Sequence, residues 1–259
     1  MNKSIKKWLP RFLMDGIRRY RMNRQLKEYK GDKVQCPICA STFSAFAPFG
    51  DYQRPNALCP RCHSLERHRL IWKYLNDQTN LFTQDQKSRL LHFAPEEAFY
   101  HVLSNHPKID YVPCDLSPEK YQDKRGPKVV KVDITDIPFE DRSFDVIICN
   151  HVLEHIPDDA RAMSELLRVL KKGGWAILMV PLDYNREITY EDFSIHSPQG
   201  REEAFGQFDH VRIYGKDYPD RLRKVGFQVD EIDFVKTFSK EDQFRFGLFD
   251  QDRLYICTN

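Results

Sequence analysis

The sequence contains no long apolar run, although hydrophobic residues occupy 41% of its 259 positions. A membrane-spanning helix needs roughly 18 consecutive apolar residues, and no stretch approaches that length. The first residues also lack the apolar core and the small-residue cleavage site of a secretory signal. We therefore expect a cytoplasmic protein. Charged residues at 30% favour a globular chain over a disordered or fibrous one.

A large excess of charge is also missing, because the formal net charge is only +2. Overall charge therefore gives no support for nucleic-acid binding, which we do not favour. The first 33 residues, however, hold many cations and only three acidic residues, and apolar residues such as Trp8 and Phe12 recur among them at helical spacing. This pattern predicts a basic amphipathic segment over 1–33, interrupted at Pro10. Such a segment suits peripheral contact with the anionic inner face of a membrane, contact with RNA phosphates, or packing on its own protein.

Disulfide bonds are not expected in such a chain, so its seven cysteines point to metal ligands or buried thiols. Cys36 with Cys39, and Cys59 with Cys62, form two Cys-x-x-Cys pairs. Two residues between cysteines let both thiolates reach one ion, and two such turns complete a tetrahedral structural zinc site. We predict a small zinc ribbon over 34–64 that binds Zn²⁺. The other cysteines are expected to be buried thiols: Cys114, Cys149 and Cys257.

From residue 88 onward short apolar runs alternate with helical patterns, which predicts βα units and a mostly parallel sheet. Strands are expected over 89–93, 109–114, 129–132, 144–149 and 175–180, with closing antiparallel strands near 227–234 and 254–257. Helices are expected over 65–75, 96–104, 158–171 and 217–225. Gly173 and Gly174 are expected to end the third of these helices. The chain then divides into a connecting helix at 65–87 and an α/β domain at 88–259.

Polar residues follow three of the expected strands, where open parallel sheets bind their ligands. Asp115 follows the second strand and suits paired ribose hydroxyls. Asp133 and Ile134 follow the third and offer a carboxylate and a backbone amide to an adenine edge. Asn150 and His151 follow the fourth, beside the expected reactive centre. Each residue alone also fits a helix cap or a turn, so the prediction of a site depends on their combination.

Four stretches resemble a known family: 132–139, 143–147, 151–158 and 170–174. The first three resemble the adenine-binding and fourth-strand motifs of class I methyltransferases of the type-11 kind. The last is similar to that family's turn before the fifth strand, with Lys172 in place of proline. The segment from Cys59 to His68 resembles a bacterial subgroup in which a zinc ribbon adjoins such a domain.

The resemblance covers roughly residues 88–235 and implies a Rossmann-like fold, with a mostly parallel seven-stranded sheet and helices on both faces. It implies S-adenosyl-L-methionine as the cofactor. The residues it assigns to cofactor binding follow the first four strands: Phe93, Ala94, Glu96, Asp115, Leu116, Asp133, Ile134, Asn150 and His151.

The loop after the first strand departs from the family pattern, because residues 91–96 contain no glycine. Ala94 is small enough for a close approach of backbone to cofactor, and Glu96 suits either a helix cap or the cofactor's ammonium group. Pro95 removes an amide donor. A nicotinamide dinucleotide is excluded, because its fingerprint needs glycines around the pyrophosphate.

Methyl transfer requires alignment of the acceptor and, for a hydroxyl, removal of its proton. His151 is the first candidate for the catalytic base and His155 the second, although a local hydrogen bond would also explain His155. The polar segment 183–207 is long for a plain connection and suits a substrate lid. Residues in and after it are expected to line an acceptor pocket: Tyr184, Tyr190, His196, Asp209, His210 and Tyr214.

We therefore expect an S-adenosylmethionine-dependent methyltransferase acting on a small molecule or a glycan, which could be carried on a membrane lipid. One alternative is an rRNA or tRNA methyltransferase that binds RNA through the zinc ribbon. Another is a non-catalytic cofactor-binding or scaffold protein, which the glycine-free loop suggests. Cofactor affinity separates the last from the others, and steeply salt-dependent nucleic-acid binding would identify the second.

Overall fold

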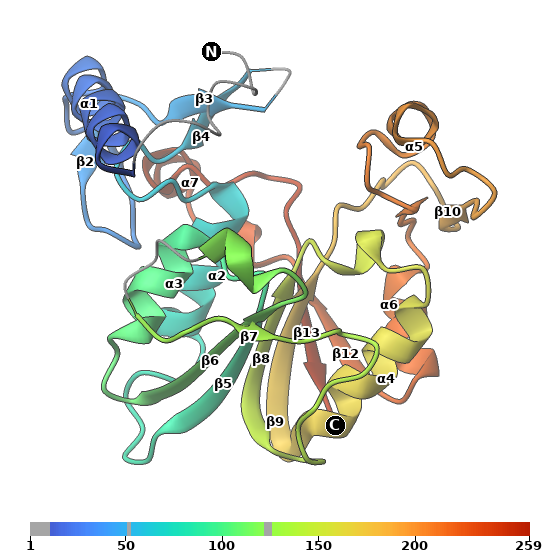
Figure 1. Cartoon of the computed structure of the whole chain (residues 1–259). Coiled ribbons are helices and arrows are strands. Elements are labelled where there is room, and N and C mark those ends of the chain that lie inside the picture. Colours follow the sequence, from blue (N-terminus) through green and yellow to red (C-terminus); the bar gives the residue numbers. More distant parts are fainter. Residues whose placement is uncertain (1–10, 51–52, 122–125) are drawn as a thin grey trace. The chain divides into compact units, whose positions relative to one another are not determined.

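The computed structural model describes residues 11–50, 53–121 and 126–259 (Figure 1). The chain divides into two compact units. The first contains residues up to Tyr74 together with 235–252, and the second contains 75–234 together with 253–259. The segment 235–252 therefore groups with the N-terminal residues, whereas the sequence analysis placed it in the α/β domain. Within the described ranges, no helix combines the length and the apolar character that a membrane span requires.

The first unit is built from short elements around two small antiparallel strand pairs, β1 with β2 and β3 with β4. Its elements are α1 (Arg11–Glu28), β1 (Val34–Gln35), β2 (Thr42–Phe43), β3 (Ala47–Phe49), β4 (Arg54–Leu58), most of α2 (Glu66–Asp77), the end of the 3₁₀ turn η4 (Phe234–Thr237), and α7 (Lys240–Phe246). Phe46 and Ala57 are buried among them. The pairs bring the two Cys-x-x-Cys segments to one place.

The predicted N-terminal helix is present as α1, which begins at Arg11. Pro10 and Trp8 lie outside the described residues, and so does the side chain of Phe12. Contact of this segment with a membrane therefore stays a prediction.

The second unit contains a seven-stranded sheet in the order β12-β13-β9-β8-β5-β6-β7 (Figure 1). Strand β13 is antiparallel to both of its neighbours, β12 and β9, and the other neighbouring strands of the sheet pair in parallel. The predicted mostly parallel sheet is therefore confirmed. Its strands are β5 (Ser88–Phe93), β6 (Ile109–Asp115), β7 (Val130–Lys131), β8 (Phe144–Asn150), β9 (Leu170–Met179), β12 (Gln228–Ile232) and β13 (Leu254–Thr258). Strand β5 pairs with both β6 and β8, which makes its carboxyl end a switch point of strand order.

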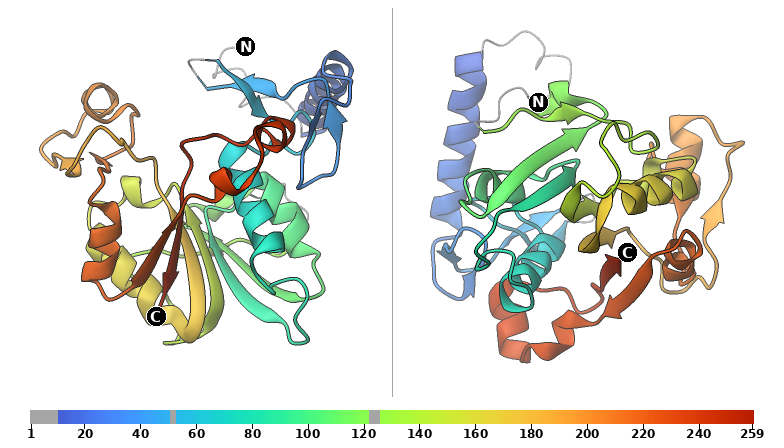
Figure 2. Two further views of the ribbon diagram at one scale, coloured as in Figure 1. Left: turned by 180° about the vertical axis from the view of Figure 1, so that it is seen from behind. Right: turned by 90° about the horizontal axis from the view of Figure 1, so that it is seen from below.

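Helices pack on both sides of this sheet. Helix α3 (Glu97–Ser104) packs on β6, α4 (Asp159–Val169) on β9, and α6 (Tyr218–Lys224) on β12 and α4. Figures 1 and 2 show α3 on one side of the sheet, and α4 with α6 on the other. Strands β5 and β8 are buried along most of their lengths, because both faces of the sheet are covered.

The remaining elements of the second unit are short. They are the 3₁₀ turns η2 (Pro118–Tyr121) and η3 (Leu153–His155), the strand pair β10 (Tyr190–Glu191) and β11 (Arg212–Ile213), and helix α5 (Pro198–Phe205). The segment 183–207 thus holds a strand and a capped helix, in which Ser197 accepts a hydrogen bond from the backbone of Gly200. Its proposed role as a lid stays a prediction.

The end of the predicted helix over 158–171 is wrong. Helix α4 stops at Val169, and β9 begins at the next residue, so Gly173 and Gly174 lie inside a strand. A Cβ on Gly174 would lie 2.8 Å from the backbone oxygen of Asp145 on β8. Glycine at this position permits the close approach of two strands and has no part in ending the helix.

Candidate functional site

A pocket of about 460 Å³ opens at the carboxyl ends of β5, β6 and β8, which is a usual size for a small-molecule site. Residues from several further segments complete its wall. The lining residues are Phe93, Ala94, Asp115, Leu116, Lys120, Val132, Asp133, Ile134, His151, Val152, His155, Ile156, Arg201 and Asp209.

Most of the residues assigned to cofactor binding line this pocket, but Glu96 and Asn150 do not. The amide of Asn150 donates to Oε1 of Glu96 at 3.2 Å, and Oε2 of Glu96 lies 2.7 Å from Nε2 of His92. Asn150 is buried, and its Oδ1 atom has no hydrogen-bond partner. Glu96 and Asn150 therefore form a polar pair next to the same strand ends, and Oδ1 of Asn150 is the acceptor without a partner.

The backbone is strained at two positions in the pocket wall. Ala94 has φ of 46° and His151 has φ of 53°, in the left-handed region that costs a residue with a Cβ about 1–2 kcal/mol. Backbone hydrogen bonds hold both residues. The amide of Ala94 donates to the backbone oxygen of Cys114 at 2.9 Å, and the amide of His151 donates to the backbone oxygen of Met179 at 2.8 Å. Strain of this kind concentrates at functional sites. It also shows how a loop without glycine makes a sharp turn at the end of β5.

Local hydrogen bonds position Asp115 and Asp133, the two acidic residues assigned to cofactor binding. Asp115 accepts from the backbone of Ser117 at 2.7 Å through Oδ1 and from the hydroxyl of Tyr121 at 2.8 Å through Oδ2. Asp133 accepts from the backbone and the hydroxyl of Thr135, and these bonds lower the pKa of the carboxyl. Asp133 therefore stays ionised and fixes the turn that contains Ile134.

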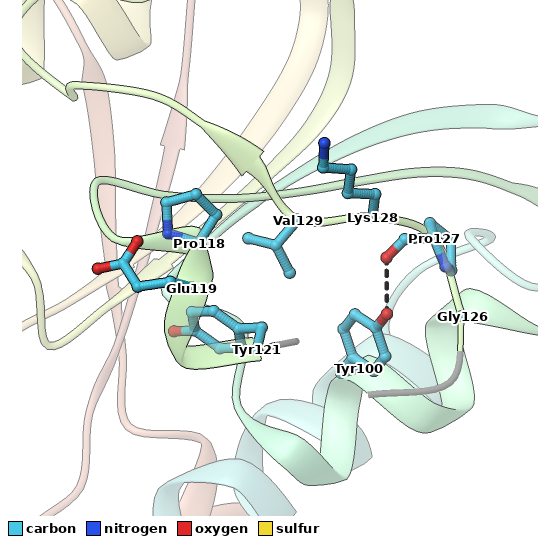
Figure 3. Close-up of a pocket in the computed structure, with 8 residues that line it drawn as sticks. All are labelled: Tyr100, Pro118, Glu119, Tyr121, Gly126, Pro127, Lys128 and Val129. Atoms are coloured by element: carbon cyan, nitrogen blue, oxygen red, sulfur yellow. Dashed lines mark hydrogen bonds between the residues drawn. The ribbon is translucent and has the colours of Figure 1, made fainter. Parts of the chain in front are cut away.

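A second pocket of about 460 Å³ lies within the second unit, beside the 3₁₀ turn η2 that carries Tyr121 (Figure 3). In Figure 3, Tyr100 from α3 closes one end, and its hydroxyl donates to the backbone oxygen of Pro127 at 2.6 Å. Burial, followed by the hydrogen bond to Asp115, raises the pKa of Tyr121, which therefore stays protonated. Tyr121 thus lines one pocket and bonds to a residue that lines the other.

The two predicted catalytic histidines lie together with a residue that the sequence analysis missed, Glu154. The carboxylate of Glu154 is only 1% exposed. Its Oε1 lies 3.5 Å from Nδ1 of His151 and 4.0 Å from Nε2 of His155, and its Oε2 has no hydrogen-bond partner. The rings of His155 and His210 meet edge to face with centroids 4.8 Å apart. The only sequence signal for Glu154 was a charge within an apolar turn.

Buried Arg212 holds this turn in place. Its guanidinium donates to the backbone oxygens of Leu153 and Pro157 at 2.9 Å and to Glu191 at 2.9 Å. The neighbouring backbone amide of Val211 donates to the oxygen of Glu154 at 2.9 Å. The chain around His210 is therefore joined directly to the turn that carries Glu154.

The expected acceptor residues have different positions. Asp209 lines the pocket, whereas Tyr214 is fully buried and donates to Asp159 at 2.7 Å. The prediction that Tyr214 lines an acceptor pocket is therefore wrong. The other expected residues are not among those that line it: Tyr184, Tyr190, His196 and His210.

In the first unit, the four cysteine sulfurs form one cluster. Sγ of Cys36 lies 3.5 Å from that of Cys62, and Sγ of Cys39 lies 3.7 Å from that of Cys59. A tetrahedral zinc ion with Zn–S bonds near 2.3 Å requires sulfurs about 3.8 Å apart. The cluster therefore fits a structural zinc ion.

Residues 96–178 match the family model described as Methyltransferase domain (Methyltransf_11). An uncharacterized protein of Methanocaldococcus jannaschii is 31% identical over 130 residues, which cover 49% of this chain and 59% of that protein. A "Probable S-adenosylmethionine-dependent methyltransferase" of Mycolicibacterium smegmatis is 31% identical over 136 residues, covering 52% of this chain and 42% of that protein. The chain thus spans about half the length of these curated relatives.

Among solved structures, an S-adenosylmethionine-dependent methyltransferase from Mesorhizobium loti resembles the chain with a TM-score of 0.51 and 15% identity. The match covers 73% of this chain and 98% of that chain. It supports the Rossmann-like fold that the strand order already indicates.

Proposed function

We propose that this chain, whose residues 96–178 match the methyltransferase-domain family model, is a class I methyltransferase that transfers a methyl group from S-adenosylmethionine to an acceptor bound beside it. The observation that supports this most is the pocket at the carboxyl ends of β5, β6 and β8. It lies at the switch point of the sheet, where α/β folds of this kind bind nucleotide ligands.

The residues present fit the cofactor. Asp115 would accept hydrogen bonds from the ribose hydroxyls, and the turn at Asp133 and Ile134 would receive the adenine. Glu96 and the unused Oδ1 of Asn150 would face the ammonium of the methionine part. When bound, S-adenosylmethionine supplies a methyl group that its sulfonium has already activated. The protein therefore needs mainly to align the acceptor and exclude water.

The acceptor side of the pocket is polar. His151, His155, Arg201 and Asp209 line it, and they come from the segment after β8 with η3, from helix α5 and from the segment before β11. A small molecule or a glycan would find hydrogen-bond donors and acceptors there. His151, directly after β8, would be the base for a hydroxyl acceptor, because its ring lies beside the expected reacting centre.

The cofactor is tested by calorimetric titration of the full chain with S-adenosylmethionine and S-adenosylhomocysteine. Asp115→Asn should weaken binding by roughly tenfold to a hundredfold, because a charge-assisted hydrogen bond contributes about 1.5–3 kcal/mol. Asp110→Asn is the matched control, since Asp110 is exposed at the other end of the same strand. No binding by folded protein, or equal binding by both variants, would refute the proposed site.

We also propose that Cys36, Cys39, Cys59 and Cys62 bind one structural zinc ion. A module of this size makes little core of its own, so the metal would contribute to its folding. Metal analysis should find one thiolate-bound zinc per chain, lost in Cys39→Ser and retained in Cys114→Ser, a buried cysteine outside the cluster. Zinc retained by Cys39→Ser would contradict the assignment.

A further inference from the structure

A buried carboxylate without a cation lies next to the methyltransferase pocket. Glu154 is almost fully buried, and within the described ranges no lysine or arginine nitrogen lies within 4.0 Å of its carboxylate. Its Oε2 has no hydrogen-bond partner at all. An ionised carboxylate in such a place is costly unless a positive charge or several donors compensate for it. The arrangement therefore requires a compensating group near Glu154.

The groups that face Glu154 are imidazoles. One potential ligand atom from each of Glu154, His155 and His210 lies within 4.8 Å of the others. His151 approaches from the end of β8, with Nδ1 3.5 Å from Oε1 of Glu154. Asp209 adds a second carboxylate, whose Oδ2 is 3.5 Å from Nδ1 of His155. Glu154, His155 and His210 thus form one cluster, with His151 beside Glu154 and Asp209 beside His155.

A hydrogen bond of His155 determines which of its ring nitrogens is available to bind a metal ion. Nδ1 lies 3.2 Å from the backbone oxygen of Asp209, an acceptor, so Nδ1 carries the proton in this bond. In the neutral ring Nε2 then keeps its lone pair, and it lies 4.0 Å from Oε1 of Glu154. A proton or a metal cation between Nε2 and Oε1 would relieve the repulsion of two acceptors at this distance. A histidine that donates from one nitrogen to a carbonyl while the other faces a cation is typical of metal sites.

We propose that Glu154, His155 and His210 bind one divalent transition-metal ion, with open coordination positions that take an oxygen ligand from the pocket. Two imidazoles and one carboxylate are the donor set of catalytic zinc and of other first-row metals, and a set of three leaves positions open. His151 and Asp209 lie near enough to add a ligand or to orient one.

The cluster is somewhat wider than a bound site would be. Ligand atoms around a tetrahedral ion at about 2.0–2.1 Å lie about 3.3 Å apart, so the 4.8 Å span must contract by side-chain rotation. Only side chains need to move, because the backbone around them is fixed. The amide of Val211 bonds to the oxygen of Glu154, and Arg212 bonds to the same turn.

The open positions would face the acceptor side of the pocket, where His155 and Asp209 line the wall. An ion there would bind a hydroxyl or carboxylate oxygen and lower the pKa of a bound hydroxyl. The substrate class would then be an oxygen-containing acceptor that chelates the ion. This part of the inference rests on the proposed methyltransferase function, whereas metal binding itself does not.

The test uses the full chain with its cysteine site filled with zinc and loosely held metal removed. Equilibrium dialysis against Co²⁺ should give one bound cobalt per chain without a thiolate-to-cobalt absorption band, because nitrogen and oxygen ligands hold it. Glu154→Gln and His210→Asn should each weaken this binding by about tenfold or more. His101→Asn is the control, because exposed His101 lies 4.0 Å from a carboxylate, Glu97, outside the proposed site.

Circular dichroism of each variant confirms that it is folded, and Glu154→Gln keeps the size of the side chain. No cobalt bound outside the cysteine site, or equal affinity in the wild type and both ligand variants, would overturn the proposal. S-adenosylmethionine titrations run on the same samples separate the two ideas. Cobalt binding without cofactor binding supports the metal site and refutes the proposed function. Cofactor binding without cobalt binding refutes the metal site and supports the proposed function.

Discussion

The guanidinium of Arg69 donates a 2.7 Å hydrogen bond to the backbone oxygen of Gly247, which lies 178 residues further along the chain. Arg69 is fully buried, and its charge lies 4.0 Å above the ring of Phe46. Its other donors reach the backbone oxygens of Ala57, Ser64 and Phe246. One side chain therefore joins the turn after α7 to the strands beside the cysteine cluster, and this explains why 235–252 belongs to the first unit.

Replacing Arg69 with methionine should lower the free energy of unfolding by roughly 3 kcal/mol or more, because it leaves several buried carbonyl oxygens without donors. Arg69→Lys should recover only part of the loss, since an ammonium group cannot reproduce the planar fork of donors. Urea unfolding of the zinc-loaded chain measures both. A methionine variant as stable as the wild type would show that these hydrogen bonds contribute little.

Asp252 should make the first unit sensitive to pH. Burial, followed by the negative charge of Glu66, raises the pKa of Asp252 from 3.8 to about 6. The folded chain thus binds this proton more tightly than the unfolded chain does. The stability from Asp252 is complete below about pH 4 and is lost as the pH rises through 6.

Asp252→Asn should therefore raise the free energy of unfolding by roughly 1–3 kcal/mol at pH 8 and by about half as much at pH 5. Urea unfolding at the two pH values compares the variant with the wild type. An equal gain in the free energy of unfolding at both pH values would mean that packing causes the effect and that the titration of Asp252 does not.

The strands could be predicted where burial leaves a continuous apolar run. Residues 89–93, 109–114 and 144–149 correspond to β5, β6 and β8 within one residue at either end. The edge strand β7 is shorter than the predicted 129–132, because it has a neighbour on one side only. Strand ends then located the pocket, because the carboxyl ends of parallel strands must meet at one edge.

The cluster at Glu154 could not be predicted in the same way. His210 reaches it where the backbone of Val211 bonds to that of Glu154, which lies 57 residues earlier in the chain, and no local pattern encodes such a pairing. Periodicity also gave no reason to expect Arg69 to bind the turn at Gly247. Contacts between loops depend on tertiary packing, which single-sequence patterns do not contain.

The misassigned glycines offer a direct comparison. Gly174→Ala should destabilise the second unit by about 1–3 kcal/mol, because its Cβ would lie 2.8 Å from the backbone oxygen of Asp145 and β8 or β9 would have to move. Gly173→Ala meets no atom within 4 Å but has φ of 76°, so it should cost only about 1 kcal/mol. Thermal unfolding ranks the two. A larger loss for Gly173→Ala would mean that backbone strain outweighs the steric contact.

Ala94 tests how a loop without glycine serves the cofactor. Its φ of 46° is one that glycine adopts freely and a β-branched residue almost never adopts. Ala94→Gly should therefore keep the turn, with a change in stability of less than about 1 kcal/mol, because relief of strain offsets the greater entropy of the unfolded chain. Its affinity for S-adenosylmethionine should stay within about threefold of the wild type, since the pocket wall keeps its shape.

Ala94→Val should behave differently on both counts. The valine would be strained in the left-handed region, and its added methyl groups would enter a pocket wall that alanine already forms. We expect a loss of roughly 1–3 kcal/mol in stability and at least about tenfold weaker cofactor binding. Calorimetric titration and thermal unfolding of the two variants measure both effects. If the valine variant binds S-adenosylmethionine as tightly as the glycine variant, the loop after β5 does not contact the cofactor, and the family's first-loop role does not extend to this chain.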